Sequence, residues 1–101
     1  MISHSLIGKT ALVGGSTQGI GLASAQAMAA MGATCYLVSR NEEKLQAAVA
    51  TLNTDAGQQH GYLVADYAHP ETIRAAITDF VATHTVHILI NNTGGPAGGP
   101  I

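Results

Sequence analysis

A glycine-rich loop between a short apolar stretch and an alanine-rich stretch limits the possible folds of this chain more than any other feature. Residues 10–14 (Thr-Ala-Leu-Val-Gly) have the continuous apolar character of a buried strand. The loop that follows carries Gly15, Gly19 and Gly21. It leads into residues 19–31, which we predict to be a helix. Apolar residues recur in this helix at helical spacing: Ile20, Ala23, Ala27 and Met31.

Strand-like and helix-like segments alternate along the rest of the chain. We predict strands at residues 33–39, 60–65 and 86–90. Gly32 ends the first helix, and residues 55–57 form a turn. The second helix runs from the N-cap Asn41 to about residue 53, and the third opens at Pro70. Their predicted apolar faces are Leu45, Ala48, Val49 and Leu52 in the second helix, and Ile73, Ala76, Ile77 and Phe80 in the third.

This alternation predicts an α/β protein with helices on both faces of a parallel sheet. Short connections and right-handed crossovers make all four strands parallel. The doubly wound arrangement gives the spatial strand order 3-2-1-4, the three-layer Rossmann fold, with a ligand crevice at the carboxyl ends of the strands. At 101 residues the chain is expected to form one domain, residues 1–101, that binds NAD(P).

Composition excludes several classes of partner. The formal net charge is −2 and the four basic residues are scattered, so we expect neither nucleic acid nor a membrane as partner. No apolar stretch approaches the roughly 20 residues needed to cross a bilayer, and the first residues lack the pattern of a signal peptide. Cys35 is the only cysteine and is predicted to be a small buried hydrophobe. A cytoplasmic protein is expected.

The glycine loop is suited to a phosphate group. The first N–H groups of a helix have no intrahelical partner, and the helix dipole favours negative charge at the same end. Glycine lets a pyrophosphate approach the backbone and adopts the angles of a tight turn. The strand–turn–helix context makes a dinucleotide the expected ligand. The predicted phosphate-binding residues are Gly15, Ser16, Thr17, Gln18, Gly19 and Ile20.

The spacing of these glycines resembles that of a known family. The pattern G-x-x-x-G-x-G over residues 15–21, together with the approach at residues 6–13, is similar to the short-chain dehydrogenase/reductase family. Within this family, the sequence is similar to the 3-oxoacyl-[acyl-carrier-protein] reductase-like members. Gly14 departs from the family, which usually has threonine there. The resemblance implies a Rossmann fold and hydride transfer between a nicotinamide cofactor and a small carbonyl or alcohol substrate.

The same resemblance assigns further cofactor contacts. Asp66 ends the third strand, and the resemblance implies that Asp66 and the following Tyr67 meet the adenine. From the residues alone, Asp66 could equally cap the following turn. Residues 91–94 resemble the family's N-N-A-G segment. This implies that Asn92, Thr93 and Gly94 run past the cofactor ribose.

The end of the second strand predicts NADP rather than NAD as the cofactor. An NAD enzyme normally places a carboxylate there for the ribose 2′-hydroxyl, but this chain has Ser39, Arg40 and Asn41. Arg40 can pair with a 2′-phosphate through its planar fork of donors. The alternative is that Arg40 is merely a solvated residue. Gln18 stands where other NADP members of the family carry a basic residue, so the preference depends on Arg40.

The catalytic pair of the family is not found in these residues. Relatives use a tyrosine followed four positions later by lysine, but Tyr36, Tyr62 and Tyr67 are followed at that spacing by arginine, aspartate and glutamate. We expect the chain to be the cofactor-binding half of a reductase, itself inactive, whose parent enzyme is homo-oligomeric. The alternative is a complete non-catalytic binding or interaction module. His84 and His87 lack a third ligand nearby, so no metal site is predicted.

Overall fold

The computed structural model describes residues 6–15, 19–66 and 68–91. These residues form four strands and three helices that alternate along the chain. In chain order the elements are β1 (Thr10–Gly14), α1 (Gly19–Ala30), β2 (Thr34–Ser39), α2 (Glu42–Val49), β3 (Gly61–Val64), α3 (Pro70–Val81) and β4 (Ile88–Asn91).

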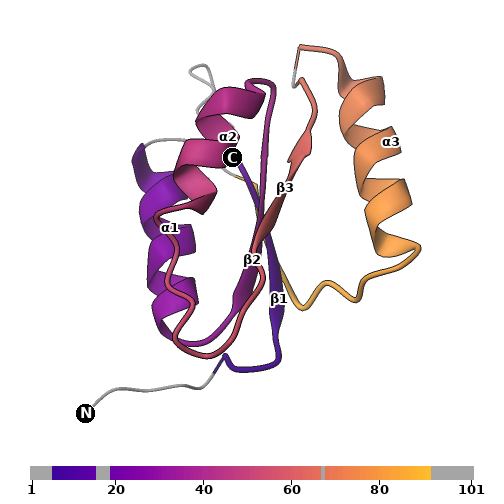
Figure 1. The fold of residues 1–101 in the computed structure, drawn as a ribbon. Helices are drawn as coiled ribbons and strands as arrows, with labels where there is room; N and C mark the ends of the chain where they lie inside the picture. The colour runs from indigo at the N-terminus through magenta and orange to yellow at the C-terminus, as the bar shows by residue number, and fades with distance from the viewer. Residues whose placement is uncertain (1–5, 16–18, 67, 92–101) are drawn as a thin grey trace.

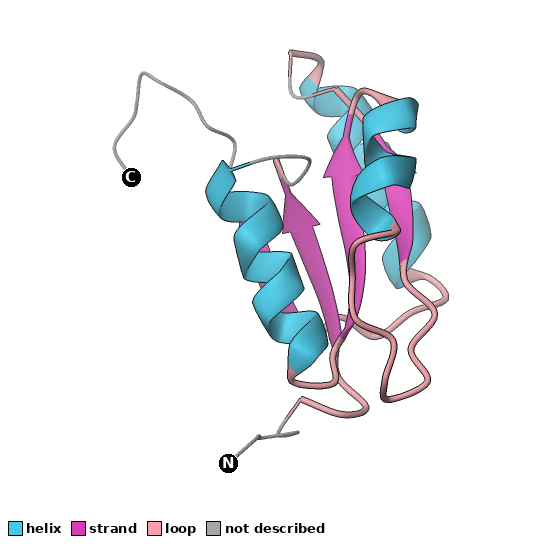
Figure 2. Cartoon of the chain, turned by 60° about the vertical axis from the view of Figure 1, so that its left-hand side comes forward, coloured by secondary structure: helices cyan, strands magenta, loops and turns pink. Residues whose placement is uncertain are grey.

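The strands form one parallel sheet in the order β3-β2-β1-β4, as predicted. Leu12 in the inner strand β1 lies beside Tyr36 of β2 on one side and Leu89 of β4 on the other. Helices α1 and α2 cover one face of the sheet and α3 covers the other (Figure 1). The three-layer α/β fold is therefore confirmed, and the strands point the same way (Figure 2).

The face of the sheet under α1 and α2 holds the larger core cluster. Ala11, Val13 and Leu37 are fully buried there, and Leu45 of α2 packs against them. Residues 50–52 leave the helix in turns of the i to i+3 type, with the N–H of Thr51 donating to Ala48 and that of Leu52 to Val49. Helix α2 thus ends at Val49 rather than at about residue 53 as predicted.

Helix α1 packs on the sheet through its smallest residues. Gly21, Ala25 and Ala29 are buried, whereas Ile20 is 76% exposed. Ala23 and Ala27 are also exposed, so the apolar residues that recur at helical spacing do not form the buried face. Apolar and small residues occur on every side of this helix, so their spacing does not indicate the buried side. Small side chains let the helix backbone approach the sheet closely, and this selects the glycine–alanine face.

On the other face of the sheet, the predicted apolar face of α3 is confirmed. Leu12 and Val38 are buried there with Phe80, and Ile73, Ala76 and Ile77 pack against them. An aromatic stack extends this cluster to the C-terminal end of the helix. The ring of Phe80 lies 4.6 Å from that of Tyr36 and stacks on that of His84 at 4.1 Å between centroids.

Two histidine side chains accept hydrogen bonds from backbone N–H groups at the amino-terminal ends of the inner strands β1 and β2. Nδ1 of His87 accepts a hydrogen bond from the backbone N–H of Thr10 at 3.1 Å. Nδ1 of His60 accepts from the N–H of Cys35 at 2.9 Å, and its Nε2 lies 2.7 Å from the carbonyl oxygen of Asn53. Because Nδ1 accepts, Nε2 carries the proton and donates to Asn53. Strands β3 and β4 start directly after these residues, slightly later than predicted.

A buried glutamine closes the end of α1. The side chain of Gln58 donates to the carbonyl oxygens of Ala29 and Ala33 at 2.8 and 3.0 Å and accepts from the N–H of Ala56 at 3.0 Å. The last carbonyls of a helix have no partner within it, so this distant side chain supplies one. Gly32 has φ +103° and confirms the predicted left-handed helix end.

The His87 bond predicts a specific pattern of stability. His87→Ala removes the acceptor for the Thr10 N–H and should lower the free energy of unfolding by about 1 kcal/mol. His87→Asn keeps an acceptor at the position of Nδ1 and should retain most of the lost free energy of unfolding. Chemical denaturation monitored by circular dichroism measures both. Equal destabilisation by the two substitutions would contradict a role for the hydrogen bond.

The edge strand β4 predicts association of the 101-residue chain. Within the described residues β4 pairs on one side only, with β1, and Leu89 is 65% exposed. Open apolar strand edges pair with other chains, so we expect light scattering to give a mass above that of a monomer. Leu89→Lys should reduce this mass. Ala75→Lys, on the exposed outward side of α3 and away from both edge strands, is the matched control and should leave it unchanged; a monomeric wild-type chain would contradict the prediction.

Candidate functional site

The carboxyl ends of the four strands bring the predicted site residues to one edge of the sheet. Gly15 follows β1, Ser39 ends β2, Asp66 lies two residues beyond β3, and Asn91 ends β4. Because the strands are parallel, these ends lie on the same side of the sheet (Figure 2). We call it the carboxyl edge.

The described parts of the glycine loop have the backbone geometry of a tight turn. Gly15 has φ +64° and Gly19 has φ +65°, values that residues with a side chain rarely adopt. The N–H of Gly15 donates to the carbonyl of Val38 at 3.1 Å, which ties the loop to β2. Gly19 begins α1, and Ile20 after it is exposed. The predicted contacts Ser16, Thr17 and Gln18 lie outside the described residues.

Arg40 is exposed at the junction between β2 and α2. The prediction that Asn41 caps α2 is confirmed, since its Oδ1 accepts from the N–H of Lys44 at 3.0 Å. Ser39 Oγ lies 3.5 Å from the N–H of Asn41. In the part of the chain that the structure describes, the one ion pair joins His69 to Glu71, so the guanidinium of Arg40 is not paired with a carboxylate there. It is free to receive an anion.

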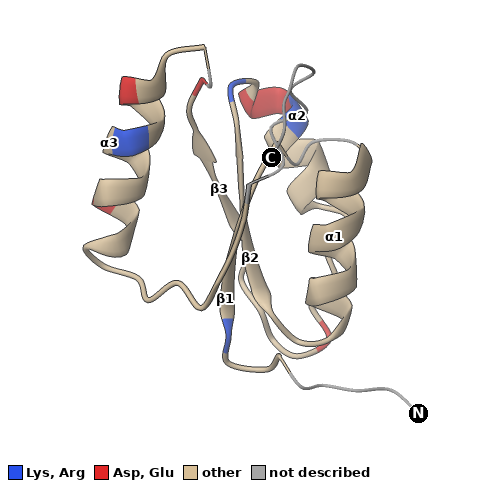
Figure 3. Ribbon diagram, turned by 180° about the vertical axis from the view of Figure 1, so that it is seen from behind, with Lys and Arg blue, Asp and Glu red and all other residues tan. Residues whose placement is uncertain are grey.

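Acidic and basic residues lie next to one another at this junction (Figure 3). Glu42 and Glu43 occupy the first turn of α2, where the helix dipole favours them. The hydroxyl of Tyr62 donates to Oε2 of Glu42 at 2.8 Å and accepts from Nε2 of Gln46 at 3.1 Å. Sequence reasoning did not assign Tyr62 to the site. The sequence offered one indication of this contact: alternate residues of a strand face opposite sides of the sheet, and the position of Tyr62 in β3 places it on the side that α2 covers.

Asp66 caps the turn after β3. Its Oδ1 accepts from the N–H of Ala68 at 2.9 Å, and its own N–H donates to Oγ1 of Thr72 at 3.0 Å. The turn-capping alternative is therefore observed, and the adenine contact stays a prediction. Four other predicted contacts lie outside the described residues: Tyr67, Asn92, Thr93 and Gly94.

Three residues without a predicted functional role, Cys35, His84 and His87, have structural roles. Cys35 is fully buried with Sγ 3.5 Å from the carbonyl oxygen of Ala25, and burial raises the pKa of its thiol from 9.0 to about 11. His84 stacks on Phe80, and His87 binds Thr10. No group of three or more potential metal ligands occurs among the residues that the structure describes.

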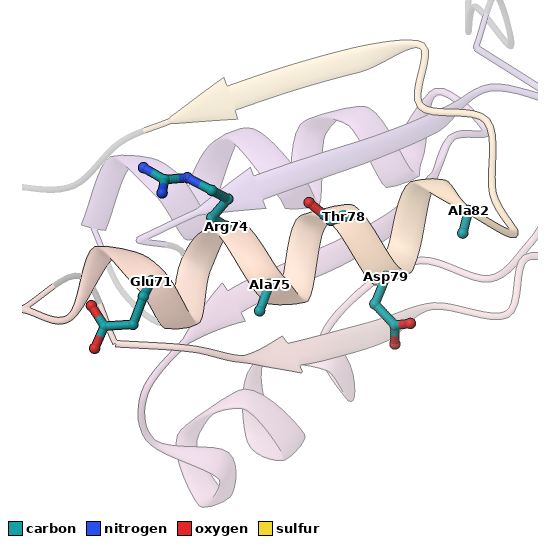
Figure 4. A pocket seen from close by; sticks show the side chains of 6 residues that line it. All are labelled: Glu71, Arg74, Ala75, Thr78, Asp79 and Ala82. Carbon is teal, nitrogen blue, oxygen red and sulfur yellow. The ribbon is translucent and has the colours of Figure 1, made fainter.

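A hollow of about 500 Å³ lies along the outward side of α3. All the residues that line it belong to that helix or its last turn: Glu71, Arg74, Ala75, Thr78, Asp79 and Ala82. Arg74 and Thr78 point to one side of the helix, and Glu71 and Asp79 point to the other (Figure 4). It is an open surface on one helix with no group of catalytic type converging on it.

Comparison with known proteins identifies the class to which this fold and loop belong. Residues 9–101 match the family described as short chain dehydrogenase, so the chain belongs to that family. It is 33% identical over 94 residues to the 3-oxoacyl-[acyl-carrier-protein] reductase FabG of Chlamydia trachomatis. That alignment covers 92% of this chain and 38% of the relative.

Solved structures show the same architecture. The chain matches L-sorbose reductase from Gluconobacter frateurii, solved with NADPH and L-sorbose, with a TM-score of 0.79 and 32% identity over 99% of this chain and 38% of that one. A metagenomic short-chain oxidoreductase in complex with NADP gives a TM-score of 0.78 and 35% identity, over 87% of this chain and 40% of that one. The chain thus spans two fifths or less of the length of these relatives. Within the described ranges no helix is both long and apolar enough to cross a membrane.

The buried thiol of Cys35 predicts a pH dependence of stability. The folded pKa of about 11 is above the ordinary value of 9.0, so the unfolded chain loses the thiol proton first. This contribution to stability is complete below pH 9 and is lost as the pH rises to about 11, to a total of roughly 3 kcal/mol. Urea unfolding at several pH values should show this loss relative to Cys35→Ala. Parallel pH profiles of the two proteins would contradict it.

Proposed function

We propose that this chain is the NADP(H)-binding part of a short-chain dehydrogenase/reductase that interconverts a ketone and a secondary alcohol by hydride transfer. The observation that carries the NADP preference is the end of β2, where Ser39 replaces a carboxylate and Arg40 is exposed and unpaired within the described residues. A carboxylate there would repel a 2′-phosphate, whereas a guanidinium binds it. Support comes from two structural relatives, one solved with NADPH and the other with NADP.

The described part of the carboxyl edge fits such a cofactor. Gly15 and Gly19 have positive φ and bracket the turn before α1, whose N-terminus favours a pyrophosphate. The proposed contacts divide by the part of the cofactor that they meet. They are residues 15–20 for the pyrophosphate; Ser39, Arg40 and Asn41 for the 2′-phosphate; Asp66 and Tyr67 for the adenine; and Asn92, Thr93 and Gly94 for the ribose.

The chemistry of the whole protein follows from the family. The residues of this chain would bind and orient the cofactor, which when bound would supply or accept the hydride. No tyrosine in the sequence is followed four positions later by lysine, so the 101 residues bind without turning over a substrate. In the whole protein the partner is a small carbonyl or alcohol substrate. It acts in the cytoplasm as a homo-oligomer.

Replacing Arg40 tests the cofactor assignment. Arg40→Asp should weaken NADPH binding by about 10- to 100-fold, because a charge-assisted pair is lost and a repulsive carboxylate is gained. Binding of NADH should change little. Titration calorimetry of the 101-residue chain measures both dissociation constants.

Lys9→Asp is the matched control for this experiment. Lys9 directly precedes β1, at the opposite end of the strands, and the substitution changes the net charge by the same amount. It should leave the binding of both cofactors unchanged. An equal loss of NADPH and NADH binding in Arg40→Asp would refute Arg40 as the phosphate partner.

A further inference from the structure

The first turn of α2 contains a conflict between helix stability and phosphate binding. Glu42 and Glu43 stabilise the positive end of the helix dipole. They also follow Arg40 within three residues, so their carboxylates could repel a bound phosphate or neutralise the guanidinium. A site for a 2′-phosphate at this junction therefore requires that these carboxylates be directed elsewhere.

Tyr62 binds one of these two carboxylates, that of Glu42. It lies in the edge strand β3 beside Leu37 of β2 and shares the face of the sheet that α2 covers. Its hydroxyl has one proton, which goes to Oε2 of Glu42 at 2.8 Å. The amide of Gln46, one helical turn further along α2, donates to the same hydroxyl oxygen at 3.1 Å. Since Gln46 can only donate through its nitrogen, the direction of both bonds is fixed.

We propose that Tyr62 is a positioning residue for cofactor discrimination, which holds the Glu42 carboxylate over β3 and so leaves Arg40 available to a 2′-phosphate. This proposal deepens the proposed function and rests on it. Tyr62 does not touch the cofactor. It acts through Glu42, whose carboxylate, once released, pairs with Arg40 or repels the phosphate.

The size of the effect follows from the exposure of the groups. Glu42 and Arg40 are both exposed, so water and salt screen their interaction. Loss of the Tyr62 hydroxyl should therefore raise the dissociation constant for NADPH by about fivefold, an effect smaller than that of removing Arg40. NADH lacks the 2′-phosphate, so its dissociation constant should stay the same.

Four variants test this in the 101-residue chain: Tyr62→Phe, Glu42→Gln, the double variant of these two, and Tyr36→Phe. Titration calorimetry with NADPH and NADH gives the ratio of their dissociation constants for each protein. Tyr62→Phe should lower the preference for NADPH about fivefold, and adding Glu42→Gln should restore it because the released side chain is then neutral. Tyr36→Phe removes a hydroxyl from the neighbouring strand on the α3 face and should leave the ratio unchanged.

Other outcomes separate the two proposals. If the wild type prefers NADPH and Tyr62→Phe keeps the same ratio, the inference is overturned and the proposed function stands. The same holds if Tyr62→Phe weakens both cofactors equally, since the hydroxyl then only anchors α2. A failure of Glu42→Gln to rescue Tyr62→Phe also overturns it. If the wild type binds neither cofactor, the proposed function fails and the inference fails with it.

Discussion

The pairing of β1 with a neighbour on each side is the constraint on which the rest of this structure depends. Ala11, Leu12 and Val13 are at most 1% exposed, because helices cover both faces of the sheet and strands cover both edges of β1. Ala11 and Val13 belong to the core under α1 and α2, and Leu12 to the core under α3. A strand with no exposed side fixes the layers around it. It also directs the loop at Gly15 and the N-terminus of α1 to the edge where the other strands end.

Polar groups at the two ends of the sheet differ in whether they have hydrogen-bond or ion-pair partners. At the amino-terminal end the rings of His60 and His87 accept the N–H groups of Cys35 and Thr10, so side chains close the hydrogen bonding of the inner strands. At the carboxyl edge the junction after β2 leaves Arg40 exposed and unpaired within the described residues. Side chains thus satisfy backbone N–H groups at one end of the sheet, and an exposed cation stands at the other.

Sequence reasoning succeeded where a signal is local and strong. The apolar face of α3 and the cap at Asn41 each follow from residues that are close in the sequence. The order of the strands follows from the regular alternation of strands and helices. It gave no guide to the buried side of α1, where Ile20 is apolar and yet exposed. Almost every residue of that helix is small or apolar, so only the space available above the sheet decides which side is buried. It also placed the end of α2 too late, because Leu52 is buried although the helix has ended at Val49.

The sequence by itself determined the alternation of elements, the glycine turn, the family and the absence of a carboxylate at Ser39. These are properties of single residues and of short spacings, so they can be recognised without coordinates. Only the tertiary structure decided which side chains meet. Tyr62 reaches Glu42 across 20 residues of sequence, His60 reaches Cys35 across 25, and His87 reaches Thr10 across 77. The register of the parallel strands creates these contacts, and no local pattern in the sequence encodes which distant groups a given register brings together.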